Sequence, residues 1–462
     1  MLALTGLLAL GAPVAADAAE RSVGADARTA VTVTIYNRDL GLVSERRRVA
    51  LAEGENRLAL KDVSAALRPE TVLLRGPGFH LIEQSFVFDL LTPQRLLEDS
   101  VGKDVRVVRT HPQTGEETLV DAELLSIAQG PVLRIGDRIE TTVPGRIVFD
   151  RLPEGLRQRP TLLARLESAS GGETELEFSY LTGGLSWAAD YLAELNAAED
   201  ALDLTGLITV TNRTGIGFAD AAVRLVAGEV SQAYDVRPLS GAQVMAEAAA
   251  APAAPAPQAL GDRYLYDLGR RVNLAPRETK QVTLLRAENV RVRKDYRFET
   301  LVNANPRAEE IGPLNAAITL EVENEAQGGL GQPLPAGIVR IYQVAGGDGG
   351  KVFAGADRIR HVPEGERFEL SLGTAFDVTG RARRTAFERL SNRSYETAQE
   401  ITVKNAKAKA VAVRLVGHMP PGWRMLSETA PHERKTANKI VWTLDVPGKG
   451  EAKLGYRVRV SR

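Results

Sequence analysis

Apolar and polar residues alternate with a period of two along most of this chain, and this pattern limits the fold more than any other feature. In residues 318–325, ITLEVENE, the aliphatic residues fall on one side and three glutamates on the other. The segments VTVTIYN, KIVWTLDV and AKLGYRVRV alternate in the same way. A strand with one buried and one solvated face produces this alternation. Turn signals such as Pro77-Gly78 and Pro447-Gly448 separate the runs. The sequence therefore predicts an all-β protein with several β-sandwiches in tandem.

The clearest exception to the strand pattern is the segment TPQRLLEDSVGKD, which begins at Thr92. Thr92 can cap a helix, Pro93 suits its first position and Gly102 suits its end. Five brief strand patterns follow between Val105 and Phe149. We therefore predict a small β-barrel-like insertion at about residues 91–150, within a sandwich that residues 30–90 begin and residues 161–180 complete.

The N-terminal residues have the features of a secretory signal. Leu2 to Ala16 is an apolar run, and Ala16-Asp17-Ala18 matches the small-residue pattern of a cleavage site. The run is too short to span a bilayer, and no other segment reaches the necessary length. We expect residues 1–18 to be a cleaved signal peptide, no transmembrane helix, and a periplasmic or extracellular location. The alternatives are an Ala-rich tail and, since no basic residue precedes the run, a natural start upstream of Met1.

Turn and composition signals divide the rest of the chain into four β domains. We expect an N-terminal sandwich over residues 28–180, a central sandwich over 181–300, a β domain over 301–376 and a C-terminal sandwich over 377–462. Residues 245–261, MAEAAAAPAAPAPQALG, are rich in Ala and Pro and predict a solvated surface loop within the central domain. A linker between domains is the less favoured alternative.

Composition narrows the possible chemistry. The 58 basic residues nearly balance the 59 acidic ones, so no overall field favours nucleic acid or an anionic membrane as a partner. The chain has no cysteine. Disulfides, thiolate catalysis and cysteine-ligated metals are therefore excluded.

Several stretches together resemble a known family. They are YNRDLGLVSERRRVALAEGENRLALKDVSAALRPETVLLR, YLTGGLSWAADYLAELN, LDLTGLITVTNRTGIGFADAAVRLVAGEV, GQPLPAGIVRIYQ and PPGWRMLSE. They look like the bacterial domain-of-unknown-function family numbered 4139, the mucoidy-inhibitor-A-like proteins, over most of residues 30–460. The resemblance implies an exported protein of immunoglobulin-like β-sandwiches, including the C-terminal one, and no established activity or ligand. Some members carry a long helical hairpin; this chain has the compact Val105–Phe149 region instead, so a hairpin-borne function is not expected.

Ser186 is the one candidate nucleophile that the sequence suggests. It lies in Gly184-Leu185-Ser186-Trp187-Ala188, which is close to the G-x-S-x-G elbow of hydrolases. An elbow leads into a helix, whereas the residues after Ser186 alternate as a strand through Leu195. We therefore predict a core strand with Trp187 on its buried face, preceded by a bend at Gly183 and Gly184 between two sheets or domains. The nucleophile is the alternative.

No local pattern indicates a metal or cofactor site. The glutamates of residues 321–325 could bind calcium or pair with a basic strand such as VRVRKDYR, with Arg291, Arg293 and Arg297; we predict pairing or solvation. Walker, Rossmann and EF-hand motifs do not occur. The histidines are too far apart in sequence for a zinc motif: His80, His111, His361, His418 and His432. We expect no metal, no cofactor and no catalytic residue.

The leading functional hypothesis is a non-enzymatic, exported interaction or scaffolding module of the cell envelope. Its partner would be an envelope protein or polymer, and not nucleic acid. The alternative is a hydrolase acting on an envelope peptide or glycan, with dispersed carboxylates that converge only in the fold. A mechanical spacer is a third possibility. A pocket with two nearby acids beside aromatic residues would favour the hydrolase.

Overall fold

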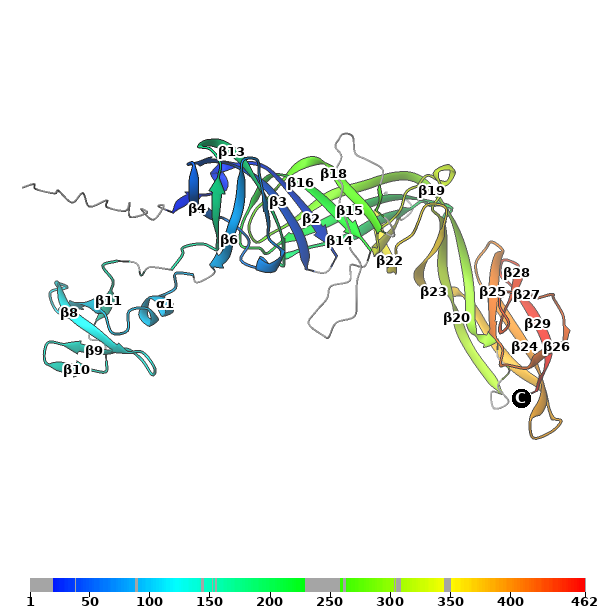
Figure 1. The fold of residues 1–462 in the computed structure, drawn as a ribbon. Helices are drawn as coiled ribbons and strands as arrows, with labels where there is room; N and C mark the ends of the chain where they lie inside the picture. Colours follow the sequence, from blue (N-terminus) through cyan, green and yellow to red (C-terminus); the bar gives the residue numbers. More distant parts are fainter. Residues whose placement is uncertain are drawn as a thin grey trace, which may run out of the picture. The chain divides into compact units, whose positions relative to one another are not determined.

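The computed structural model describes residues 20–37, 39–87, 90–142, 145–151, 153, 156–228, 258–260, 263–302, 304, 309–344 and 350–461. Strands dominate this part of the chain (Figure 1), which confirms the predicted all-β class. The helices are one α-helix and three short 3-10 turns: α1 (Pro93–Glu98), η1 (Ala25–Ala27), η2 (Pro69–Thr71) and η3 (Ala326–Gly328). None of these helices has the length and apolar character that a membrane span requires.

The described strands form four sheets, in each of which a strand pairs with the one named before it and the one named after it. The first contains β1 (Arg21–Val23), β4 (Gly54–Lys61), β12 (Thr161–Ser168) and β6 (Phe79–Val87). The second contains β17 (Gln258–Leu260), β18 (Arg263–Leu274), β16 (Phe218–Ala227), β2 (Arg28–Tyr36), β3 (Leu40–Leu51), β13 (Gly172–Thr182) and β5 (Leu73–Arg75). The third contains β10 (Arg138–Glu140), β9 (Val132–Ile135), β8 (Glu117–Ser126), β7 (Asp104–Thr110) and β11 (Arg146–Val148).

The fourth sheet is built from strands that lie between Leu185 and Ser461. It contains β22 (Lys351–Ile359), β21 (Gly337–Val344), β14 (Leu185–Leu195), β15 (Ala201–Asn212), β19 (Glu278–Val302), β20 (Glu310–Glu323), β23 (Arg367–Arg389), β24 (Ser394–Asn405), β29 (Gly450–Ser461) and β26 (Trp423–Glu428). Beside this path, β25 (Val411–His418) pairs with β19 and β28 (Lys439–Val446), and β28 pairs with β27 (Glu433–Arg434). Trp442 of β28 is fully buried in the core that this part of the chain encloses.

The first two sheets face each other as a sandwich. Apolar residues alternate inward on both, so that Val33 of β2, Leu58 of β4 and Phe178 of β13 are essentially unexposed. The side chain of Arg47 crosses from β3 to the backbone carbonyls of Val23 and Lys61, on β1 and β4. The sandwich therefore closes over charged as well as apolar side chains.

The predicted insertion is present as a helix followed by five strands. Thr92 accepts a hydrogen bond from the Arg95 backbone N–H, Pro93 occupies the first turn, and Gly102 has a φ of 77°. The described sheet is open, however, with β10 and β11 as its two edges. Each of these edge strands has only three residues. The barrel-like closure expected from the strand count does not form in the described residues, because these short strands do not pair with each other.

Three buried asparagines have the same structural role in successive parts of the fold. Each lies at or just after the end of a strand. Its amide donates to one carbonyl nearby in sequence and to two carbonyls at a distant turn that contains a residue with positive φ. Asn212 binds Ile216 O, Leu274 O and Ala275 O; Asn324 binds Gln332 O, Val362 O and Pro363 O; Asn405 binds Lys409 O, Val446 O and Pro447 O. The turns have Arg277, Gly365 and Lys449 at the positive-φ position. The repeated arrangement indicates repeated sandwich units.

The described chain divides into two compact units. One draws on Met1–Ser186, Thr211–Arg224 and Gly269–Glu278, and the other on Trp187–Val210, Leu225–Leu268 and Thr279–Arg462. The four domain boundaries expected from the sequence stay a prediction. The signal peptide at 1–18 lies outside the described residues, as does the Ala/Pro-rich segment 245–261 except for the backbone of β17.

Candidate functional site

A buried triad of charged residues lies behind a pocket on the seven-stranded sheet. Arg28 of β2 is directly opposite Arg47 of β3. Glu45 accepts hydrogen bonds from Arg28 at 2.9 and 3.0 Å and from Arg47 at 2.8 and 3.0 Å. Two cations facing each other across a strand pair would repel, and the shared carboxylate removes that repulsion. The triad keeps one net positive charge.

The local sequence explains why these charges point inward. Glu45 and Arg47 alternate with Val43 and Val49 on the buried face of β3. Arg47 also donates to the carbonyls of Val23 (3.0 Å) and Lys61 (2.6 Å), so its charge is fully solvated by protein groups. On β2, a bulge follows Arg28, since the register passes from Arg28–Arg47 to Ala30–Arg46. A bulge changes the direction in which a side chain points. In β2 the side chain affected is that of Arg28, at the start of the strand.

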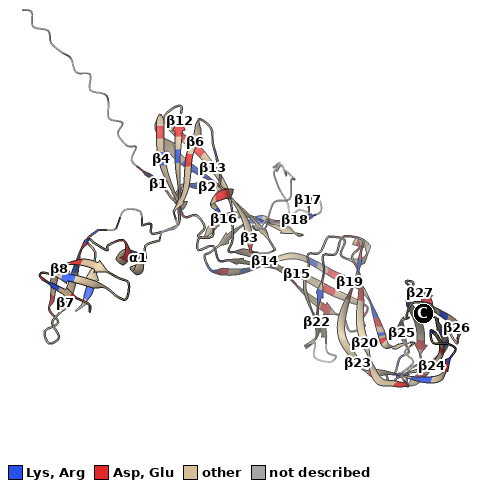
Figure 2. Cartoon of the chain, turned by 60° about the horizontal axis from the view of Figure 1, so that its bottom comes forward, with Lys and Arg blue, Asp and Glu red and all other residues tan. Residues whose placement is uncertain are grey.

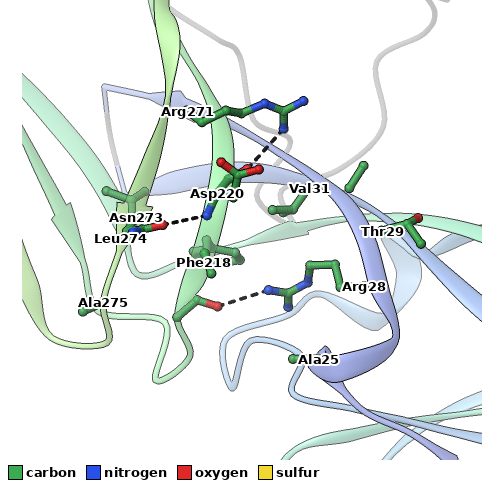
Figure 3. Close-up of a pocket in the computed structure, with 13 residues that line it drawn as sticks. Ala25, Arg28, Thr29, Val31, Phe218, Asp220, Arg271, Asn273, Leu274 and Ala275 are labelled. Atoms are coloured by element: carbon green, nitrogen blue, oxygen red, sulfur yellow. Dashed lines mark hydrogen bonds between the residues drawn. The ribbon is translucent and has the colours of Figure 1, made fainter.

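The pocket has a volume of about 560 Å³ (Figure 3). Residues of η1 and β2 form one wall; residues at the start of β16 and the end of β18 form the other. Phe218, Val31 and Leu274 are buried at its base. The remaining lining residues are Ala25, Arg28, Thr29, Ala30, Gly217, Ala219, Asp220, Arg271, Asn273 and Ala275.

Charged groups stand on both sides of this pocket. Arg28 donates from Nη1 to the Gly217 carbonyl at 3.4 Å, and Arg271 donates from Nη1 to the Asp220 carbonyl at 3.1 Å. The backbone N–H of Asp220 donates to Asn273 Oδ1 at 2.7 Å. Asp220 has a φ of 50°, a left-handed conformation that aspartate tolerates better than most residues. The backbone that carries its carboxylate is therefore held in one position.

The lining residues suit recognition better than hydrolysis. Asp220 is the one carboxylate among the thirteen residues and Thr29 the one hydroxyl. A glycosidase needs two carboxyl groups across the reacting bond, and a nucleophile needs an adjacent base. Arg28 is always protonated and is held by Glu45, so it cannot act as that base. The pocket thus offers arginine hydrogen-bond donors and a single carboxylate.

A second pocket, of about 240 Å³, lies on the four-stranded sheet and includes two acids, Glu20 and Glu83. Glu83 pairs with Arg165 at 3.0 Å. The hydrogen bond from Arg157 lowers the pKa of Glu20 below its usual value. A general acid requires the opposite shift, so this site does not favour the hydrolase either.

Ser186 lies in β14, and the predicted core strand is confirmed. Trp187, Tyr191 and Leu195 are buried on one face, and Ser186 is on the other. Gly183 and Gly184 connect β13 of one sheet to β14 of another, as predicted. Gly184 has a φ of 81°, and a β-carbon there would lie 2.9 Å from the Arg213 backbone, so glycine is required at the bend.

The five histidines lie apart from one another, and each has an ordinary structural role or an exposed position. His432 contacts Glu428 at 2.9 Å between the rings of Trp423 and Trp442. His361 accepts a hydrogen bond from Ala336 N–H, and burial lowers its pKa. The others are apart: His80 pairs with Glu167 at 3.7 Å, His111 accepts turn N–H groups, and His418 ends β25. Among the described residues, no group of three or more histidines and acids could hold a metal ion.

The glutamate row was predicted to be paired or solvated, and Glu321 and Glu323 are paired while Glu325 is exposed. Glu321 is opposite Arg293 on the neighbouring strand and contacts it at 2.6 Å. Glu323 contacts Arg367 at 2.7 Å. Glu325 precedes η3 and is not part of the strand. Figure 2 shows acidic and basic residues interspersed along the strands of this region.

Sequence reasoning did not identify the pocket residues. One signal was available, because Glu45 and Arg47 interrupt an apolar face in LGLVSERRRVAL. Charged residues at such positions are rarely buried without a partner. No local pattern points to Asp220 or Arg271, which reach the pocket only through the pairing of distant strands.

A family model described as Domain of unknown function (DUF4139) matches residues 176–461. The comparison with curated proteins gives no match. The matched range includes the pocket wall from β16 and β18, whereas the β2 wall precedes it. The resemblance predicted from the sequence is confirmed over residues 176–461; its extension to residue 30 and the mucoidy-inhibitor-A-like label stay predictions.

Proposed function

Because this chain belongs to the DUF4139 family, whose description assigns no activity, we propose its function from the chemistry of the pocket: a non-enzymatic interaction or scaffolding module of the bacterial envelope. The observation that carries the proposal is the locked charge at the pocket wall. Arg28 is fixed by two hydrogen bonds to a fully buried carboxylate. A preorganised donor on rigid strands favours binding, since little entropy is lost when a partner arrives.

The location is part of the proposal. The apolar run from Leu2 to Ala16, with its A-x-A end, supports export to the periplasm or the medium. A chain without cysteine is compatible with this environment, because its sandwiches enclose large apolar cores without cross-links. The partner would be an envelope protein or polymer.

Export is tested by fractionating the producing cells and sequencing the N-terminus of the purified protein. We expect the mature chain in the periplasm or the medium, beginning near Ala19. Intact Met1 on protein from the cytoplasm would contradict the proposed location.

The binding role is tested by affinity capture from envelope extracts with the full mature protein. A partner should be retained by the wild type and lost when both rim charges are reversed, in Asp220→Lys/Arg271→Glu. The matched control is Arg270→Glu, which changes the neighbouring exposed arginine of β18 that does not line the pocket. If the charge-reversed variant retains the partner as well as the wild type does, the interaction does not take place at the pocket and the proposal is contradicted.

A further inference from the structure

From the charges around the pocket, we propose that it binds a short peptide that has both a carboxylate and a free amino group. The ligand carboxylate would lie between Arg28 and Arg271, and the ammonium group would contact Asp220. This inference rests on the proposed binding function and names the class of ligand that the site recognises.

The carboxylate position follows from the two guanidinium groups. Arg28 uses Nε and Nη2 for Glu45, which leaves Nη1 with one contact of 3.4 Å to the Gly217 carbonyl. This is longer than an ordinary N–H···O bond of about 2.9 Å, so Nη1 is available to a better acceptor. Arg271 has one bond to a backbone carbonyl and no ion pair with any described residue. A planar carboxylate matches guanidinium donors in geometry and charge.

The amino group follows from Asp220. Its carboxylate is exposed and has no ion pair within the described part of the chain, not even with Arg271 beside it. Figure 3 shows Asp220 beside Arg271, whose guanidinium reaches the Asp220 backbone carbonyl. An anion that carried no positive group would be repelled by this carboxylate. A ligand with both signs of charge satisfies Asp220 and the arginines together.

The size of the pocket limits the ligand. Phe218, Val31 and Leu274 lie beneath it and are almost fully buried, at 0%, 2% and 3% exposure, so the charged and polar residues above them carry the recognition. A volume of about 560 Å³ lies within the range of small-ligand pockets, which is about 300–1,000 Å³. A short peptide with a free amino terminus and an acidic group therefore fits the site better than an inorganic anion, which has no positive group for Asp220.

The test uses saturation-transfer NMR on the full mature protein with the dipeptide alanyl-glutamate as the probe. Transfer to the dipeptide should be seen at millimolar concentration. N-acetyl-alanyl-glutamate should bind at least about tenfold more weakly, because it lacks the ammonium group that contacts Asp220. Alanyl-glutamine amide should be weakened at least as much, because amides replace both of its carboxylates and leave the two arginines without an anion. Equal binding of the acetylated and free dipeptides would overturn the role of Asp220. The absence of saturation transfer to every probe would overturn the ligand class.

Variants locate the binding in the pocket. Arg271→Gln should weaken alanyl-glutamate about tenfold, and Asp220→Asn should remove the preference for the free amino group; asparagine tolerates the positive φ. Arg270→Gln is the control and should bind as the wild type does. Circular-dichroism melts establish that each variant is folded. Unchanged binding in Arg271→Gln would place the dipeptide elsewhere and overturn the inference.

The two proposals can fail separately. If no dipeptide binds but envelope capture still depends on Asp220 and Arg271, the ligand class is wrong and the binding function stands. If the dipeptide binds at the pocket but no partner depends on it, the envelope interaction is wrong.

Discussion

Arg47 and Glu45 form an ion pair of 2.8 Å in which neither side chain is exposed to solvent. The two residues are neighbours on the inner face of β3, where the alternation would otherwise place apolar side chains. Glu45 holds Arg28 as well, so this pair connects the core of the sandwich to the wall of the pocket.

Replacing Glu45 should therefore be costly. Glu45→Gln leaves two buried arginines without their counter-ion, and we expect a loss of about 3–5 kcal/mol in the free energy of unfolding. The control is Glu177→Gln, which removes a pair with Arg46 of 3.9 Å in which both side chains are more than half exposed; its effect should be below about 1 kcal/mol. Urea denaturation measures both. Similar values for the two variants would show that the buried triad is dispensable.

Trp187 and Ser186 should differ sharply when truncated. Trp187 is 6% exposed and packs beside Tyr266 at 6.4 Å between ring centroids. Trp187→Ala should destabilise the protein by about 3–5 kcal/mol, and Ser186→Ala by less than about 1 kcal/mol. Thermal and chemical melts measure the effects. A fluorophosphonate should not label the protein; labelling at Ser186 that the alanine variant abolishes would establish a serine hydrolase.

The repeated asparagines should each matter for stability. Asn405 is 2% exposed and donates to carbonyls of Lys409, Val446 and Pro447 at 2.9–3.3 Å. Asn405→Ala removes the amide donor from all three carbonyls, although Pro447 O keeps its hydrogen bond from Gly450 N–H, and we expect a loss of about 1–3 kcal/mol. Asn392→Ala, at an exposed turn between β23 and β24, is the control and should be nearly neutral. Denaturation midpoints compare the two, and equal midpoints would rule out the proposed role of the amide.

Glu199 should contribute to the loss of unfolding free energy at acidic pH. Burial alone would raise its pKa, but hydrogen bonds from Lys294 (2.7 Å) and Gln343 (2.9 Å) outweigh burial and lower it below 4.5. Its stabilising contribution is therefore complete at neutral pH and is lost as the pH falls below about 4.5 through the lower pKa of the folded state.

Glu199→Gln should accordingly reduce stability at pH 7, by about 1 kcal/mol or less, and approach the wild type near pH 3. Unfolding free energies at pH 7, 5 and 3 measure this. Glu194→Gln removes a more exposed pair with Lys351 and should have the smaller effect at pH 7. A difference between Glu199→Gln and the wild type that does not shrink with acid would contradict the assignment.

The strand segments could be predicted because their cause is local. Side chains of a strand alternate between its faces, so the pattern after Ser186 was sufficient to place Trp187 and Tyr191 in the core. The helix from Pro93 was equally local, since its cap and first-turn residues are adjacent in sequence. The open sheet that follows was not predictable, because strand count does not determine whether two edge strands are long enough to pair.

The amino-acid sequence by itself thus determined the all-β class, the buried face of strands such as the one from Leu185 to Leu195, and the family. Only the tertiary structure decided the pocket, where Arg28 contacts Gly217 across 189 positions of sequence. Alternation records which side of a strand is buried, and it carries no information about which strand lies beside it. The order of the strands in the sheet depends on non-local pairing, and this pairing also places Glu45 where it neutralises two arginines. The pocket therefore exists only once β2, β3, β16 and β18 have assembled.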